Sequence, residues 1–368
     1  MRILMLAPSL NGSSYLIPYT YAKILEKKHD VTIVGPTFGE GIFVNDNSVR
    51  VERLEPWISK PKSLGAFTLI PRNFARLLRN DFDVIFCFKL LPHTAPVSAL
   101  AKFVLRKPLV ITIDDYDKAS PKSVLKRFVL GIADWFHRFA DEKIVMSRFM
   151  QRTYGGHLIY QPIDTDRDRP TQKTADALRA KLGLEDKIVV THVGTLFETK
   201  GIDVLIKAVQ ATGREDIKLV LFELGAETAK YKAMSGPETI WLKKRTGEKS
   251  LDYTLMADIY AIPTRDTLYT RAQTPAKIFE AMAMGRAIVA SELGDISTIL
   301  QNGEAGLLVR PNDVESLKYA LMRLADDRAL RERLGKNAKR VYDETYHHEK
   351  QAEKLIDLYD ELEKRMNR

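Results

Sequence analysis

The sequence predicts an α/β protein with two domains, each built on a parallel sheet covered by helices. A chain of 368 residues is long enough for two such domains with separate cores. In residues 1–165, short apolar runs alternate with helical patterns. The runs are Ile3–Ala7, Val31–Val34, Val84–Phe88 and Leu109–Ile113. This alternation is typical of parallel sheets.

A second series of strand patterns begins at residue 188. It includes Ile188–Val193, Lys218–Phe222 and Asp258–Ile262. Between the two series, the charged and Pro-containing stretch Asp164–Thr174 has the composition of a domain boundary. We therefore expect one domain over residues 1–167 and a second over 168–345. Residues 346–368 then form a terminal helix.

Composition excludes several classes of protein. Cys87 is the only cysteine, which excludes an internal disulfide and favours a reducing compartment. No signal-peptide pattern opens the chain, because the apolar run Ile3–Ala7 is short. No apolar stretch approaches the ~20 residues of a membrane span. We expect a cytoplasmic protein.

Positive charge is concentrated in the first half. Residues 1–165 hold 23 Lys and Arg against 15 Asp and Glu, which is +8 of the total +9. Residues 64–80 and 118–139 are basic and amphipathic, which allows contact with an anionic membrane or packing on a core. Their basic side chains include Arg72, Arg76, Arg79, Lys122, Lys126 and Arg127. No nucleic-acid-binding pattern is present, so we expect no nucleic acid partner.

The stretch Thr274–Ser291 reads as a helix followed by a buried strand. Thr274 is predicted to cap the helix, Pro275 to occupy its first position, and Gly285 to end it. Lys277 then lies in the first turn, where a cation is unfavourable unless an anion lies beyond the helix end. A phosphate would meet this requirement.

Glu280 faces the same side of this helix as Lys277 and could accept hydrogen bonds from ribose hydroxyl groups. The alternative is a surface Lys–Glu pair worth a few tenths of a kcal/mol.

Loops that follow strands carry the other candidate residues, because ligands bind there in open α/β sheets. In the first half these residues are Gly12, Lys89, His93 and Asp114. Asp115 is predicted to have a turn or capping role, since adjacent carboxylates on a strand point to alternate faces.

In the second half, Lys200 in the loop 194–201 suits phosphate binding, although a solvated surface lysine is the alternative. Arg265 or Arg271 could add a second charge. No histidine is expected to bind metal: on a helix, His347 and His348 would point about 100° apart.

Two of these motifs resemble the retaining GT-B glycosyltransferases of family four. Pro275, Lys277 and Glu280 match a "P-x-K-x-x-E" form of the family signature, in which the Glu binds the nucleotide ribose. Lys200 is similar to the Lys of the "G-R-L-x-x-x-K-G" loop, which neutralises the donor diphosphate.

The chain departs from the family pattern at three places. Thr195 stands where the family loop has Arg, and Ala272 stands where many members have an earlier Glu. Asp114 replaces a His that reaches the donor sugar in many members.

The resemblance implies a GT-B fold, with two Rossmann-like domains facing a cleft and a terminal helix crossing back to the first domain. It implies sugar transfer from a nucleotide diphosphate sugar to a glycan or lipid-linked acceptor, with retention and without a metal ion or other cofactor. The first domain would bind the acceptor and the second the donor. The expected donor-binding residues are Gly12, Thr195, Lys200, Arg265, Thr274, Pro275, Lys277 and Glu280. The expected catalytic residues are Lys200, Glu280 and Asp114, and Lys89 and His93 lie on the acceptor side.

Two other functions remain open at this point. A nucleotide-sugar 2-epimerase shares the fold but needs acid/base groups that the sequence does not identify. A non-catalytic module that binds nucleotide sugar would also explain the missing Glu and Arg.

Overall fold

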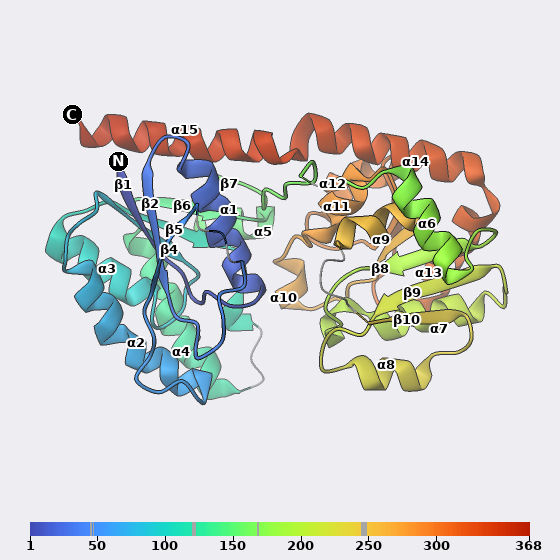
Figure 1. Ribbon diagram of the computed structural model, residues 1–368, viewed down its shortest axis with the longest axis horizontal. Coiled ribbons are helices and arrows are strands. Elements are labelled where there is room, and N and C mark those ends of the chain that lie inside the picture. The colour runs from blue at the N-terminus through green and yellow to red at the C-terminus, as the bar shows by residue number, and fades with distance from the viewer. Residues whose placement is uncertain (45, 47, 120–122, 168, 244–248) are drawn as a thin grey trace. The chain divides into compact units, whose positions relative to one another are not determined.

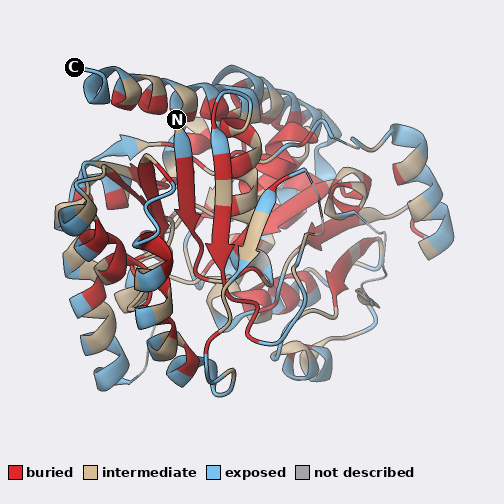
Figure 2. Cartoon of the chain, turned by 60° about the vertical axis from the view of Figure 1, so that its left-hand side comes forward, coloured by how far each residue is buried: buried red, intermediate tan, exposed pale blue. Residues whose placement is uncertain are grey.

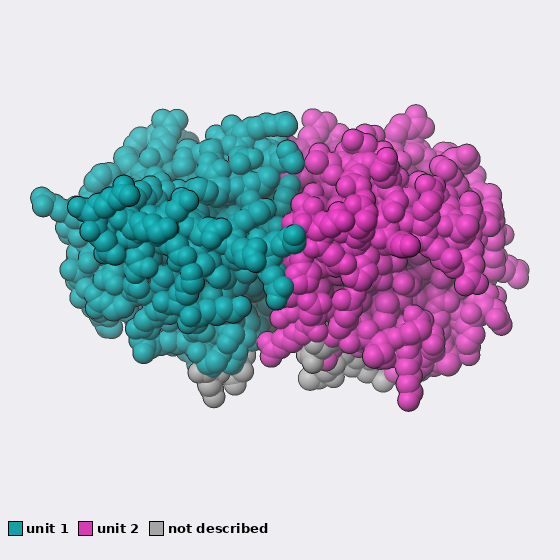
Figure 3. All heavy atoms as spheres, turned by 90° about the horizontal axis from the view of Figure 1, so that it is seen from above, with its two compact units in different colours: residues 1–162, 349–368 teal, residues 163–348 magenta. Residues whose placement is uncertain are grey.

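The computed structural model describes residues 1–368 except 45, 47, 120–122, 168 and 244–248 (Figure 1). The chain forms two compact units (Figure 3). Unit 1 comprises residues 1–162 and 349–368, and unit 2 comprises residues 163–348. The structural boundaries thus fall a few residues from the predicted ones, and residue 168 lies outside the described residues.

Unit 1 is built on a parallel sheet with strand order β3-β2-β1-β4-β5-β6-β7. The strands are β1 (Arg2–Leu6), β2 (Asp30–Gly35), β3 (Arg50–Arg53), β4 (Val84–Phe88), β5 (Leu109–Ile113), β6 (Glu142–Val145) and β7 (His157–Leu158). The central strands are apolar and buried, as Figure 2 shows. The chain proceeds from β1 to one side and later from β4 to the other, so the topological switch point lies between β1 and β4.

Helices cover this sheet, and the terminal helix is one of them. They are α1 (Leu16–Leu25), α2 (Lys62–Leu77), α3 (Ala95–Leu105), α4 (Val124–Trp135), α5 (Arg148–Tyr154) and α15 (His348–Met366), with short 3₁₀ turns at Ser13–Tyr15, Asp117–Ala119 and Phe136–Phe139. From α15, Leu355, Leu358 and Tyr359 enter the core of unit 1. The predicted return of the terminal helix to the first domain is therefore confirmed.

Unit 2 has a second parallel sheet, with strand order β10-β9-β8-β11-β12-β13. The strands are β8 (Ile188–His192), β9 (Ile217–Phe222), β10 (Thr239–Leu242), β11 (Ile259–Ile262), β12 (Ala287–Ser291) and β13 (Leu307–Val309). Its switch point lies between β8 and β11, so the loops after these strands define the expected ligand site.

The helices of unit 2 flank this sheet. They are α6 (Gln172–Leu182), α7 (Ile202–Ala211), α8 (Thr228–Met234), α9 (Ser250–Met256), α10 (Leu268–Arg271), α11 (Lys277–Ala283), α12 (Ile296–Ile299), α13 (Val314–Asp326) and α14 (Arg328–Val341). A π-helical segment, Tyr342–Tyr346, precedes α15, and 3₁₀ turns lie at Glu198–Lys200 and Gln301–Gly303. These two parallel α/β units confirm the predicted fold class.

One helix boundary was predicted wrongly. The helix α11 begins at Lys277 rather than at Pro275, and its N-cap position, Ala276, offers no side-chain hydrogen bond. The Thr274 hydroxyl group donates instead to Asp295 Oδ2 at 3.3 Å, so it caps nothing. The other end was predicted correctly, because Gly285 has φ +62°.

A second correction concerns the basic segments of unit 1. Arg76 is 5% exposed, and its guanidinium group lies 2.8 Å from Asp81 Oδ1 and 2.9 Å from Glu52 Oε1. Arg76 is therefore a buried structural residue and cannot contact a membrane. Lys122 lies outside the described residues.

Candidate functional site

The loops after β8 and β11 are held in direct contact at the switch point of unit 2. Gly201 ends the β8 loop with φ +66°, and a Cβ atom there would lie 1.9 Å from the Pro263 carbonyl oxygen. The Arg265 backbone N–H donates to the Thr199 carbonyl at 2.9 Å. Lys200 lies between Thr199 and Gly201, the two residues that make these contacts, so the close approach of the loops fixes its backbone position.

The first turn of α11 meets the same edge of the sheet, because α11 follows the β11 loop. Lys277 Nζ lies 2.7 Å from Glu280 Oε1, and Ser250 Oγ donates to Glu280 Oε2 at 3.2 Å. The Glu280 side chain is 9% exposed, whereas that of Lys277 is 33% exposed. The carboxylate thus holds the ammonium group at the rim of the site.

The charges of both lysines act on His192, the last residue of β8. Its Nδ1 donates to the Ala261 carbonyl at 2.9 Å, since a carbonyl oxygen can only accept. Burial lowers the pKa of His192 to about 4, and the charges of Lys200 and Lys277 act in the same direction. The imidazole is therefore neutral at pH 7. Sequence reasoning missed this residue, although its place before the Lys200 loop was a usable signal.

The two arginines considered for the donor site are paired with carboxylates. Arg265 forms an ion pair with Asp203, and Arg271 Nη2 lies 2.7 Å from Asp266 Oδ2. Both arginine charges are therefore paired with carboxylates of unit 2, as the Lys277 charge is with Glu280. Thr195 is exposed in the β8 loop, and Thr274 and Pro275 are half-buried in the segment before α11.

The candidate residues of unit 1 gather at the ends of β4 and β5. Lys89 Nζ lies 3.2 Å from Asp114 Oδ2 and also forms an ion pair with Asp115. The prediction that these two carboxylates would face opposite sides is wrong. The strand ends at Ile113, so the alternation of a strand no longer applies to the residues that follow.

Burial acts strongly on the acidic groups of this cluster. It raises the pKa of Asp114 to about 6 and that of Asp117 to about 7, although the Lys89 charge opposes both shifts. Among the described residues, Asp114 Oδ1 and Asp117 Oδ2 are buried and have no hydrogen-bond partner. They retain acceptor capacity for hydroxyl groups.

His93 and Gly12 lie in the loops at the switch point of unit 1. His93 is buried, and its Nε2 donates to the Pro8 carbonyl at 3.1 Å, which ties the β4 loop to the β1 loop. Burial lowers its pKa to about 4. Gly12 has φ +62°, and a Cβ atom added there would meet no atom within 4 Å, so the space above its backbone is open.

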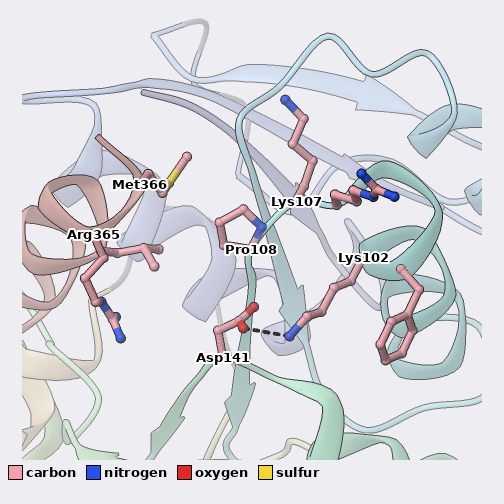
Figure 4. Close-up of a pocket in the computed structure, with 9 residues that line it drawn as sticks. Lys102, Lys107, Pro108, Asp141, Arg365 and Met366 are labelled. Carbon is pink, nitrogen blue, oxygen red and sulfur yellow. Dashed lines mark hydrogen bonds and ion pairs between the residues drawn. The ribbon is translucent and has the colours of Figure 1, made fainter. Parts of the chain in front are cut away.

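A cavity of about 560 Å³ lies elsewhere in unit 1 (Figure 4). Its lining includes Lys102, which lies 2.6 Å from Asp141, and Arg365. Lys107 and Pro108 precede β5, and Asp141 precedes β6, so the cavity opens at the amino ends of the strands. Since ligands of parallel sheets bind at the carboxyl ends, we assign this cavity no donor or acceptor role.

The expectation that the side chains of His347 and His348 point about 100° apart on a helix is wrong. The helix α15 begins only at His348, and both imidazoles lie against the Asp166 carboxylate.

Comparisons with known proteins agree with the two-unit fold. Residues 18–167 match the model of the Glycosyltransferase Family 4 domain, and residues 174–341 match that of Glycosyl transferases group 1. Together the two models span most of the chain and indicate a family 4 glycosyltransferase of the GT-B fold. By these two matches the chain is a glycosyltransferase, and its two-unit fold agrees with them.

Individual relatives are distant. The alpha-D-kanosaminyltransferase of Streptomyces kanamyceticus is 26% identical over 290 residues, which is 70% of this chain and 72% of the relative. An uncharacterized glycosyltransferase of Methanocaldococcus jannaschii is 24% identical, covering 91% of this chain and 90% of the relative. Among solved structures, Anabaena HepE in complex with UDP superposes with a TM-score of 0.80 at 20% identity, covering 98% of this chain and 100% of that one.

Proposed function

We propose that this enzyme transfers a sugar from a nucleotide diphosphate sugar bound by unit 2 to a glycan or lipid-linked acceptor bound by unit 1. The transfer proceeds with retention and without a metal ion. The observation that carries the proposal is that Lys200 and Lys277 follow the neighbouring strands β8 and β11 at the switch point of unit 2, where both charges act on His192. The UDP complex of the structurally similar HepE supports a nucleotide donor.

The two lysines suit the leaving group of this reaction. A nucleoside diphosphate gains negative charge as the glycosidic bond breaks, and fixed cations stabilise that charge without reorganisation. Lys277 is oriented by Glu280, and the Lys200 backbone is held by the contact between the β8 and β11 loops. Because these cations do the work that Mg²⁺ does elsewhere, we expect no metal requirement.

Glu280 has a second role towards the ribose. Its carboxylate is largely buried and accepts hydrogen bonds from two donors, the Lys277 ammonium group and the Ser250 hydroxyl group. A carboxylate has about four acceptor positions, so ribose hydroxyl groups can be added.

The unit 1 cluster suits a hydroxyl-rich acceptor. Asp114 Oδ1 is a buried acceptor without a partner among the described residues, and Lys89 holds the other oxygen of this carboxyl group. Asp114 would accept a hydrogen bond from the acceptor hydroxyl group and so orient it for attack.

The donor half of the proposal is tested by thermal shift with UDP, GDP and ADP. A ligand at ~100 times its Kd adds about 2.7 kcal/mol to the free energy of unfolding. We expect one of the three to raise Tm, and transfer from the matching nucleotide sugar to persist in EDTA. A transfer activity abolished by EDTA and restored by Mg²⁺ or Mn²⁺ would contradict the proposed charge balance. Stereochemical analysis of the product tests retention.

We also propose that unit 1 works at an anionic membrane, through α4. The apolar face of this helix is exposed: Leu125 is 71%, Phe128 66% and Trp135 48% accessible. Contiguous exposed apolar patches mark interaction sites. Lys126 and Arg127 are exposed beside them, and each basic side chain near an anionic surface contributes about 1 kcal/mol.

The position of α4 connects this surface to the acceptor cluster. Lys118, one residue after Asp117, forms an ion pair with Asp134 of α4 at 2.8 Å. A lipid-linked acceptor held at the membrane would thus lie near the unit 1 carboxylates. In the part of the chain that the structure describes, no helix is both long and apolar enough to cross a bilayer. The proposed location is therefore peripheral, on the inner face of the membrane.

Sedimentation with liposomes tests this placement. Wild-type protein should bind vesicles that contain anionic lipid at low salt, and binding should fade by ~0.5 M salt. The double variant Leu125→Ser/Phe128→Ser should bind more weakly. The double variant Lys230→Glu/Arg310→Glu, which reverses two exposed charges of unit 2, is the control and should bind as wild type. Wild-type protein that stays in the supernatant would refute the membrane surface, and self-association through α4 would instead indicate a second copy as its partner.

A further inference from the structure

A cluster of metal-ligating side chains lies where unit 2 begins and ends. Asp166 follows the first residues of this unit, and His347 and His348 close it. One ligand atom from each of the three side chains can be chosen so that all lie within 4.8 Å of one another. None of these residues belongs to the proposed donor site.

The distances within the cluster suit a small cation. Asp166 Oδ2 lies 3.0 Å from His347 Nε2 and 3.7 Å from His348 Nδ1. Ligand atoms about 2.1 Å from a tetrahedral ion are roughly 3.4 Å apart. The two observed separations lie on either side of this value, so small side-chain rotations would complete the geometry.

The backbone explains why adjacent histidines can converge. The π-helical segment ends at Tyr346, and His347 has an extended ψ of 140° before α15 starts at His348. This break brings the two rings together, with centroids 4.5 Å apart. In a continuous helix the rings would point about 100° apart.

A second carboxylate lies close to the cluster, at a distance somewhat longer than a hydrogen bond. His348 Nε2 lies 3.8 Å from Asp164 Oδ1, which itself accepts from the Arg167 backbone N–H at 2.8 Å. The other oxygen of Asp166 faces Arg169 Nη1 at 3.3 Å. His348 Nδ1 is buried and, among the described residues, makes no hydrogen bond. A carboxylate behind a ligating imidazole is the usual outer partner of a zinc-bound histidine.

We propose that this cluster binds one divalent transition metal ion of the zinc type, through Asp166 Oδ2, His347 Nε2 and His348 Nδ1. Water completes the coordination, since all three side chains keep some solvent exposure. Two imidazoles and one carboxylate favour Zn²⁺ over Mg²⁺ or Ca²⁺, which prefer oxygen ligands.

The ion has a structural role that is separate from sugar transfer. It joins the segment that opens unit 2 to the segment that closes it. Both segments belong to unit 2 and lie next in sequence to residues 162–163 and 348–349, where the chain passes from one unit to the other. Removing the ion should loosen these two segments and leave the lysines of the donor site in place.

Calorimetric titration of the untagged full-length protein with Zn²⁺, after removal of metal by a chelator, tests the proposal. We expect one ion per chain with a Kd in the micromolar range or tighter. His347→Ala, His348→Ala and Asp166→Asn should each weaken binding roughly tenfold or more. His157→Ala is the matched control, because His157 also lies beside a carboxylate, 2.8 Å from Glu142, but in unit 1. It should bind as wild type.

Co²⁺ absorption and the nucleotide-induced change in Tm test the metal site separately from the donor site. Co²⁺ should give the visible absorption of a tetrahedral site in wild-type protein and lose it in His348→Ala. The nucleotide-induced rise in Tm should persist in all variants, which separates this inference from the proposed function. Absence of saturable Zn²⁺ binding, or equal affinity in wild type and the three ligand variants, would overturn it.

Discussion

A methyl group at Gly201 would test whether contact between the β8 and β11 loops positions the donor site. Gly201 has φ +66°, and an added Cβ would lie 1.9 Å from the Pro263 carbonyl oxygen, where real Cβ atoms essentially never come closer than 3.0 Å. In Gly201→Ala the two loops must therefore separate by roughly 1 Å. Lys200, the residue before the glycine, moves with its loop.

Two effects contribute, and they can be separated. A left-handed conformation costs a non-glycine residue roughly 1–2 kcal/mol, whatever the space around it. A displacement of about 1 Å at a catalytic group can lower the rate by ~10²-fold. Gly201→Ala should therefore lose both stability and transfer activity.

Gly213→Ala is the matched control. Gly213 has φ +64°, but a Cβ atom added there would have no neighbour within 4 Å. The Gly213→Ala variant should lose stability only through the cost of a left-handed backbone conformation for alanine, and it should retain transfer activity. Urea unfolding measures the first effect, and initial rates of transfer measure the second. If Gly201→Ala transfers sugar at the wild-type rate, the loop contact does not position the site.

The other predictions concern the charged groups of unit 2. Lys200→Ala should lower the transfer rate by ~10²–10³-fold, because a fixed charge at the leaving diphosphate is lost, while the far-UV circular dichroism spectrum of the variant stays unchanged. If the variant transfers sugar at the wild-type rate, Lys200 is not part of the donor site. Glu280→Gln should weaken binding of nucleoside diphosphate more than binding of inorganic pyrophosphate, since the lost contact is to ribose. Equal loss for both ligands would assign Glu280 a purely structural role.

The sequence predicted the central strands of both sheets because buried parallel strands are continuous apolar runs, whereas it did not reveal the less buried strands β3, β6, β7 and β10. Val84–Phe88 and Ala287–Ser291, for example, are buried at every position. The end of α11 was equally legible, since Gly285 has the positive φ that such an end requires. The beginning of α11 could not be predicted locally, because the Thr274 hydroxyl group donates its hydrogen bond to Asp295, 21 residues away in the sequence.

Charge pairing was also hard to predict, because the partner of a charged side chain can come from a distant part of the sequence. Arg76 looked like a membrane-facing cation until the fold brought Glu52 from β3 and Asp81 against it. In α4, periodicity showed an apolar face but could not show that the core leaves it uncovered. His192 was missed because its significance depends on Lys277, 85 residues further along the chain. Local patterns thus predict which face of an element is apolar, and tertiary contacts decide what meets it.

Glu280 raises a question about charge in the proposed site, because its pairing with Lys277 could cancel the cation that the diphosphate needs. The geometry argues otherwise. The Glu280 side chain is 9% exposed and the Lys277 side chain 33%, so the ammonium group is the more accessible member of the pair. An approaching diphosphate would meet Lys277 first, while Glu280 would favour the lysine rotamer that forms the ion pair. Ribose hydroxyl groups would then occupy the remaining acceptor positions of the same carboxylate. One residue can therefore orient the cation for the diphosphate and recognise the sugar of the nucleotide.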